Sequence, residues 1–182
     1  MKKENKILDF FITTLNGMAY GLFATLIIGT IIGSIGGLFP DTEFNNILKQ
    51  TSSLLSNLTG AGIGIGIALA LKADSLKTIV LASVGEISSY FSLTTKFVND
   101  GTITNSMKIG DPLTIYLVVI ITNLLLKLIF QKKTPVDILL VPLCGISLGL
   151  IFSLLVRYPT IYVTYGIQYI VNEATLIQPI LM

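Results

Sequence analysis

Glu86 is the side chain of this sequence with the clearest potential for chemistry, because it is ionisable and lies near the middle of an apolar segment, residues 76–93. An ionisable group inside a membrane costs a few kcal/mol, so it faces a cavity or a partner rather than lipid. Two interpretations are open. Glu86 forms a substrate or proton site in a pore, or its segment is short and the carboxyl reaches a wet outer vestibule or pairs with a polar neighbour.

A second set of candidates lies where a polar stretch meets a glycine-rich run. Asn57 and Thr59 carry groups that hydrogen-bond the hydroxyls of a sugar, and the adjoining Gly60 and Gly62 offer backbone groups. The same residues can instead cap a break in a helix. Asn123, in a later apolar segment, is the last candidate substrate-binding residue, and its alternative role is a hydrogen bond between helices.

The composition excludes several kinds of chemistry. The sequence has no His, which removes a phosphohistidine carrier, a His proton relay and most metal sites. Its one cysteine, Cys144, cannot form a disulfide within the chain, and we interpret it as a small apolar filler. The glycine run lacks the spacing of a nucleotide-binding loop. We expect no catalytic residue, metal site or cofactor on this chain, and no nucleic-acid partner, since its lysines flank apolar segments without forming a patch.

The elements that position these residues are predicted to be membrane helices. Hydrophobic residues make up 52% of the 182 residues, charged residues make up 12%, and the mean hydropathy is +0.81. Soluble domains carry about 25% charged residues. We therefore expect an all-α integral membrane protein, with residues 1–182 forming a single membrane domain.

Small residues recur at every fourth position of the first apolar segment, and a second run repeats the pattern. In lipid, such ridges let helices approach closely. The ridges are Gly17/Gly21/Thr25/Gly29/Gly33/Gly37, then Gly60/Gly64/Ala68 and Gly62/Gly66/Ala70. We expect the first two spans to pack and slide along these ridges, with Asn57, Thr59 and Glu86 lining a polar midplane site open to either side in turn.

The apolar segments predict a polytopic bundle of about five transmembrane helices plus interfacial amphipathic helices, since a span needs ~20 apolar residues. Asp111 and Pro112 are suited to begin the fourth span as N-cap and first helical residue. A tyrosine stripe after the fifth span predicts a helix at the headgroup level. The expected spans cover residues 17–39, the glycine run with part of the polar stretch before it, 76–93, 112–130 and 135–156, and the stripe is Tyr158, Tyr162, Tyr165 and Tyr169.

The basic residues predict the orientation, because cytoplasmic loops carry more Lys and Arg. With the N-terminus inside, the inner side holds Lys2, Lys3, Lys6, Lys72, Lys77, Lys127, Lys132 and Lys133, and the outer side holds Lys49, Lys96, Lys108 and Arg157. Eight against four favours a cytoplasmic N-terminus.

Several stretches resemble, in order along the whole chain, a phosphotransferase-system (PTS) IIC-like family that includes perfringolysin O regulator-like proteins. They are residues 15–33, residues 58–66, Gly110-Asp-Pro112, Pro135-Val-Asp-Ile138 with Pro142, and residues 174–179. Members of that family are longer, and this chain resembles their N-terminal half.

The resemblance implies a sugar permease domain in a bacterial cell membrane, working with cytoplasmic IIA and IIB proteins that supply the phosphoryl group. It implies a role in phosphotransfer without catalytic residues on this chain. A homodimer or a separate C-terminal half are possible partners. The alternative is a membrane-embedded regulator or sensor that binds a ligand and signals without transport.

Overall fold

The computed structural model describes residues 6–39, 42–94, 104–105, 110–131 and 134–177, and this part of the chain is almost entirely helical. A two-residue strand pair, β1 (Leu93–Thr94) and β2 (Thr104–Asn105), is antiparallel with Leu93 opposite Asn105. The expected all-α class is confirmed. The helices are α1 (Lys6–Leu22), a π-helix η1 (Phe23–Ile27), α2 (Ile28–Gly36), α3 (Glu43–Asn57), α4 (Thr59–Ala70), α5 (Ser75–Phe91), α6 (Pro112–Ile129) and α7 (Asp137–Ile177).

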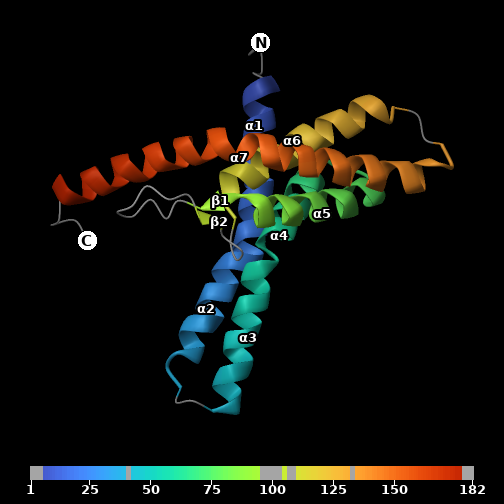
Figure 1. Ribbon diagram of the computed structural model, residues 1–182. Helices are drawn as coiled ribbons and strands as arrows, with labels where there is room; N and C mark the ends of the chain where they lie inside the picture. Colours follow the sequence, from blue (N-terminus) through green and yellow to red (C-terminus); the bar gives the residue numbers. More distant parts are fainter. Residues whose placement is uncertain (1–5, 40–41, 95–103, 106–109, 132–133, 178–182) are drawn as a thin grey trace, which may run out of the picture.

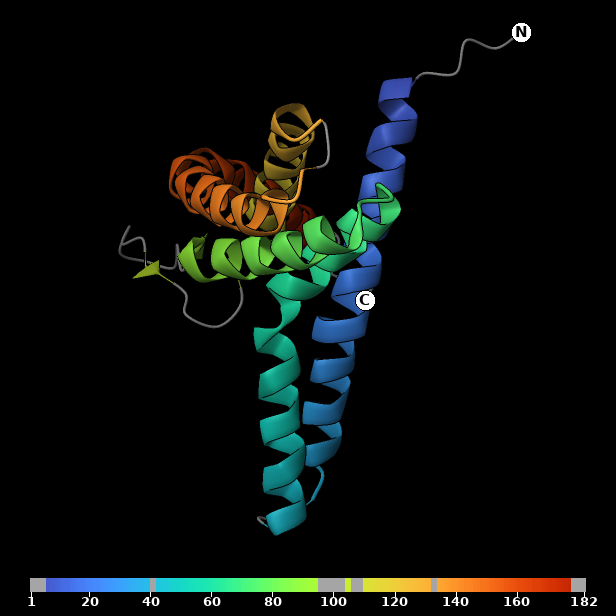
Figure 2. The same cartoon turned by 90° about the vertical axis from the view of Figure 1, so that its right-hand side faces the viewer.

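Two groups of helices cross at a steep angle (Figures 1 and 2). The helices α1, η1 and α2 form one continuous column with α3 returning beside α2, and α5 and α7 run across this column. Transmembrane helices tilt by ~20° on average and rarely beyond ~40° from the bilayer normal. Only one of the two groups can therefore lie close to the normal, and the arrangement is crossed rather than that of a parallel bundle.

Among the described helices, three stretches are long and apolar enough to cross a membrane, residues 6–36, 112–129 and 137–173. A fourth is the pair α3 and α4, which passes the same test together but is bent by 49°. The sequence predicted about five spans. The difference is α5, a helix of 17 residues that includes Lys77 and Glu86.

The column of α1, η1 and α2 packs on α4 through glycines that face each other. A β-carbon added at Gly66 would lie 2.0 Å from the carbonyl oxygen of Gly17, and one added at Gly21 would lie 2.3 Å from that of Gly62. Such distances leave no room for any side chain, so the two backbones touch directly. The predicted ridge packing between the first apolar segment and the glycine run is confirmed.

The second ridge of α4 faces α5. A β-carbon added at Gly60 would lie 2.4 Å from the Gly85 carbonyl oxygen, and one added at Gly64 would lie 2.2 Å from that of Leu81. The helix α4 is therefore held between α1 and α5 by backbone contacts on both sides. The buried side chains of Ile63 and Ile67 lie in the core formed with α5 and α6.

The lower part of the glycine ladder packs within the chain, on α3. Gly29 and Gly33 lie against Ser52, and Gly36 lies against Leu48, whereas Gly37 is exposed. Four residues rotate an α-helix by 400°, so a strict four-residue ladder drifts ~40° per step and leaves the contact face. This drift explains why Gly36 takes the place predicted for Gly37.

The last helix, α7, differs from the prediction in being continuous for 41 residues, with Pro142 and Pro159 inside it. The sequence predicted a span ending at Val156 and a separate interfacial helix. The Thr160 hydroxyl donates to the Val156 carbonyl oxygen at 2.8 Å. Nearby Ser and Thr side chains of this kind let a membrane helix continue through proline.

The tyrosine stripe stands on the C-terminal part of α7, which extends beyond the other helices (Figure 1). Small residues of α7 pack on α5, since Gly145 lies against Val80 and Gly149 against Val84. Some predictions concern residues outside the described ranges: most of the polar loop 94–110, the motif end Gln178 and Pro179, and the lysines Lys2, Lys3, Lys96, Lys108, Lys132 and Lys133.

Candidate functional site

The candidate site is centred on the break between α3 and α4. The two helices meet at Leu58, whose ψ of 5° departs from helical geometry, and the chain bends there by 49°. The Thr59 side chain is fully buried, and its hydroxyl donates to the Ser56 carbonyl oxygen at 2.7 Å. Thr59 therefore supports the bend on the α3 side.

Glu86 supports the break from the other side. Its Oε2 accepts a hydrogen bond at 3.0 Å from the backbone N–H of Ala61, in the first turn of α4. First-turn N–H groups have no partner within their own helix, and a carboxylate there also complements the helix dipole. The structure thus provides a polar neighbour for Glu86, as one of the two interpretations expected, and this neighbour is a backbone N–H group. The other carboxylate oxygen, Oε1, makes no hydrogen bond within the described residues.

The contact between Gly60 and Gly85 is what brings the Glu86 carboxylate to α4. Because neither glycine has a side chain, the α4 and α5 backbones approach closely, and Glu86 follows Gly85 directly. The sequence placed Glu86 in one site with Asn57 and Thr59, beside the glycine run, but did not indicate a bond from Glu86 to the backbone of that run. The bond to Ala61 joins residues 25 positions apart, which no local pattern indicates.

The other predicted site residues fall into two groups. Thr59, Gly60 and Glu86 meet at the start of α4, and Asn57 is exposed at the end of α3, next to the same break. Gly62 belongs to the α1 contact, where a β-carbon would lie 2.8 Å from the Thr25 methyl group. The remaining residue, Asn123, lies apart from this group.

Asn123 is 7% exposed within α6, and no contact described here joins it to Glu86. Its neighbour Thr122 and the α5 residue Ser88 are fully buried, and their hydroxyls have no hydrogen-bond partner in the described part of the chain. Sequence reasoning did not select these two hydroxyls, since single Ser and Thr residues in apolar helices are common and give no signal of their own.

A separate polar cluster joins α6 to α7. Asp111 accepts hydrogen bonds from the N–H of Thr114 at 3.1 Å and from the hydroxyl of Thr164 at 3.3 Å. The hydroxyls of Thr114 and Thr160 are 2.6 Å apart and buried. Asp111 therefore caps α6 as predicted, and its carboxylate also reaches α7.

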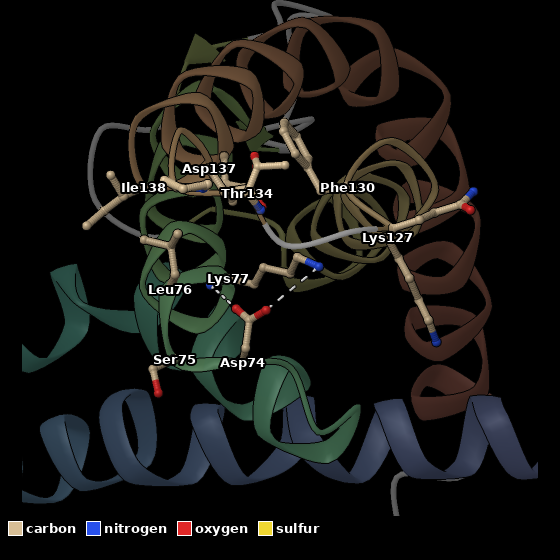
Figure 3. Close-up of a pocket in the computed structure, with 12 residues that line it drawn as sticks. Asp74, Ser75, Leu76, Lys77, Lys127, Phe130, Thr134, Asp137 and Ile138 are labelled. Atoms are coloured by element: carbon tan, nitrogen blue, oxygen red, sulfur yellow. Dashed lines mark hydrogen bonds and ion pairs between the residues drawn. The ribbon is translucent and has the colours of Figure 1, made fainter.

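The clearest pocket lies at a different place, where α5 and α7 begin and α6 ends (Figure 3). It has a volume of about 730 Å³. None of the site residues predicted from the sequence lines it. The lining is Asp74, Ser75, Leu76, Lys77, Lys127, Phe130, Gln131, Thr134, Pro135, Asp137, Ile138 and Val141.

The two carboxylates of this pocket are engaged in capping helices. Asp74 accepts from the Lys77 N–H at 2.9 Å, and its other oxygen lies 3.8 Å from the Lys77 ammonium nitrogen. Asp137 accepts from both the N–H and the hydroxyl of Thr134. Lys127 forms no ion pair within the described residues. The pocket therefore combines an apolar wall with two lysines and two aspartates, and of these only Asp74 and Lys77 form an ion pair with each other.

Comparison with known proteins gives one informative result. Residues 12–182 match a family model described as "Phosphotransferase system, EIIC". Searches of curated proteins and of solved structures found no match.

Proposed function

Because this chain belongs to the EIIC family of the phosphotransferase system, we propose that it serves as the membrane permease component through which one sugar crosses the bacterial cell membrane. The observation that supports this most directly is the broken helix pair α3–α4 with Glu86 on the α4 N-terminus. Transporters commonly bind substrates at discontinuous membrane helices, where backbone groups are left for the ligand.

In this proposal the sugar binds at the break. Asn57 donates and accepts hydrogen bonds at the exposed end of α3, and the Oε1 of Glu86 accepts from a sugar hydroxyl while Oε2 remains on Ala61. Thr59 and the backbone of Gly60 shape the site from the α4 side. Gly62 and Asn123 remain predicted sugar contacts. In this conformation Gly62 packs on the column of α1, η1 and α2 and Asn123 is buried, so either residue would contact the sugar only after the helices rearrange.

We propose a topology with the N-terminus in the cytoplasm, and we place the pocket on the same side because Lys77 and Lys127 line it and cytoplasmic loops carry the excess of Lys and Arg. We propose that the IIB partner, which carries a phosphoryl group, contacts the chain at this end. We also propose that residues 1–182 correspond to the N-terminal half of a IIC-like domain, and that a second copy or a separate C-terminal half completes the path.

The test is sugar uptake into proteoliposomes that contain the protein, its IIA and IIB partners and a phosphoryl donor, with a panel of sugars. Glu86→Gln retains an oxygen to accept from Ala61 but loses the charge, so we expect uptake to fall by about tenfold or more, as for a lost charge-assisted hydrogen bond of ~1.5–3 kcal/mol. The matched control is Glu43→Gln, at an exposed position in the first turn of α3. Unchanged uptake in Glu86→Gln would refute the role of this carboxylate.

The regulator alternative is supported by this pocket, whose two lysines and two aspartates offer a charged surface to a cytoplasmic protein without involving the break. Under this alternative the wild-type protein transports none of the sugars, and Lys127→Gln weakens binding of the cytoplasmic partner. Under the permease proposal uptake is measurable in the wild type. The two functions are therefore separated by the wild-type uptake measurement alone.

A further inference from the structure

The exposed surface of α3 is divided lengthwise into a polar and an apolar half. The polar face consists of four exposed, uncharged residues, Asn46, Gln50, Ser53 and Asn57. Their spacings of four, three and four place them in one row along the helix. The charged residues of α3, Glu43 and Lys49, lie in the half of the helix remote from the break.

The apolar face of α3 runs beside this row. Phe44, Ile47, Leu54 and Leu58 are each more than half exposed. The third side of the helix, with Leu48 and Ser52, packs on the glycines of α2. The exposed surface of α3 thus has a polar side and an apolar side, and the half-buried Thr51, the polar side chain on the apolar side, donates its hydroxyl to the Ile47 carbonyl oxygen.

The helix α2 continues the same division. Because α2 and α3 are antiparallel and pack through Gly29 and Gly33, helix geometry places Thr30 and Ser34 on the side of the polar face of α3. The same geometry places the exposed Ile28, Ile31 and Ile35 with the apolar face. The α2–α3 hairpin therefore has one polar surface and one apolar surface.

Hydrocarbon cannot satisfy a row of amides and hydroxyls, whereas it is the natural environment of the apolar face. The pair α3–α4 is apolar enough, as a whole, to cross a membrane. If α3 crosses, its polar face must therefore turn to water or to protein. At its inner end the row reaches Asn57, beside the break at which Glu86 bonds to Ala61.

We propose that the polar face of α3 lines a water-filled path, leading from the membrane surface at the α2–α3 turn to the break. Amide and hydroxyl groups both donate and accept hydrogen bonds, and the row carries no charge, so the molecule that moves along it is a neutral polyhydroxylated one. The identity of this molecule as a sugar rests on the proposed function, but the existence of the path does not.

The test uses single cysteines in a Cys144→Ala background, since Cys144 is the only native thiol. Cysteines at Asn46, Gln50 and Ser53 are compared with cysteines at the apolar neighbours Phe44, Ile47 and Leu54. A charged, membrane-impermeant thiol reagent reacts with thiolates in water, so we expect the polar positions to react at least about tenfold faster. Equal rates on the two faces would overturn the proposal.

A second measurement separates a spanning hairpin from one that lies flat on the membrane, where the polar face would also meet water. Spin labels at Phe44→Cys and Leu54→Cys report depth through their collisions with oxygen and with a water-soluble relaxation agent. Ten residues of helix rise by ~15 Å, so a spanning α3 places these labels at clearly different depths. Equal depths show a hairpin lying in the membrane plane and overturn the proposal.

Protection by sugars then tests the proposed function separately. If polar-face cysteines react quickly and depths differ, but no sugar in the panel slows their reaction, the path stands and the sugar assignment fails. If polar-face cysteines do not react and instead form disulfides between two copies of the chain, a second copy covers the face and the path is refuted. Slower reaction of Ser53→Cys with one sugar, and unchanged reaction of Asn46→Cys at the path entrance, supports both.

Discussion

Replacing Gly66 by Ala tests the central feature of this fold, the direct backbone contact between α1 and α4. The added β-carbon would lie 2.0 Å from the Gly17 carbonyl oxygen, and real β-carbons do not approach other atoms closer than 3.0 Å. Because the opposing atom belongs to a backbone, it cannot rotate away. The two helices must therefore separate by about 1 Å, which also opens the neighbouring contact of Gly21 with Gly62.

The size of the effect follows from two opposing contributions. Overpacking of a tight interior costs about 1–3 kcal/mol, and the rigid contact atom places this site near the top of that range. Ala is favoured over Gly in a helix by up to about 1 kcal/mol. We expect a net loss of about 2 kcal/mol, which for a chain of this size lowers Tm by roughly 4–8 °C.

The assay is thermal unfolding of the purified protein in detergent, followed by a thiol-reactive fluorophore, because half-buried Cys144 is the only thiol. The matched control is Gly166→Ala in α7, where an added β-carbon meets no atom within 4 Å. It keeps the propensity gain without the clash, so its Tm should be equal to or above that of the wild type. A Gly66→Ala protein as stable as Gly166→Ala would refute the reasoning.

Three further experiments test other positions. Lys72, which follows the C-cap of α4, has a φ of 52°. This left-handed conformation costs non-glycine residues ~1–2 kcal/mol, so Lys72→Gly should raise Tm by a few degrees in the same assay. Asp111→Ala removes the cap of α6 and should cost about 1–2 kcal/mol, with Asp111→Asn recovering most of it. The hydroxyls of Thr14 and Tyr116 form a buried hydrogen bond of 2.8 Å that joins α1 to α6. A double-mutant cycle of Thr14→Val and Tyr116→Phe should give a coupling free energy of about 1 kcal/mol, and a coupling of zero would contradict this role.

The packing ridges were predictable from the sequence because glycine spacing is a local property. The four-residue ladder and the two ridges of the glycine run all occur as helix contacts, apart from the shift from Gly37 to Gly36. What the ladder does not specify is the partner of each ridge. Gly17 and Gly21 contact α4 whereas Gly29 and Gly33 contact α3, and this division depends on where α3 ends and α4 begins.

The parts that the sequence did not predict depend on contacts between distant residues. Glu86 was identifiable as an ionisable residue within an apolar segment, but its bond to the Ala61 N–H requires the α4–α5 approach at Gly60 and Gly85. The continuation of α7 through Pro159 was missed for a related reason. The local sequence indicates a break there, while the buried Thr160, bonded to Thr114 of α6, holds the helix together from outside.

These contacts also bear on how the site could open to either side in turn. The sequence suggested that the first two spans slide past each other. In the structure α4 is held on opposite sides by backbone contacts to α1 and α5, so sliding would have to break both sets together. The α3–α4 break itself is held by a hydroxyl of Thr59 and by one carboxylate bond from Glu86, and α3 is further held by its packing on the glycines of α2. A change in the bend at Leu58 therefore keeps the contacts of α4 with α1 and α5, and it keeps the packing of α3 on α2 only if these two helices move together, with a matching bend at η1. A sugar hydroxyl that donates to the Oε1 of Glu86 would share the carboxylate that holds this bend through Ala61, and so would couple binding of the sugar to the bend.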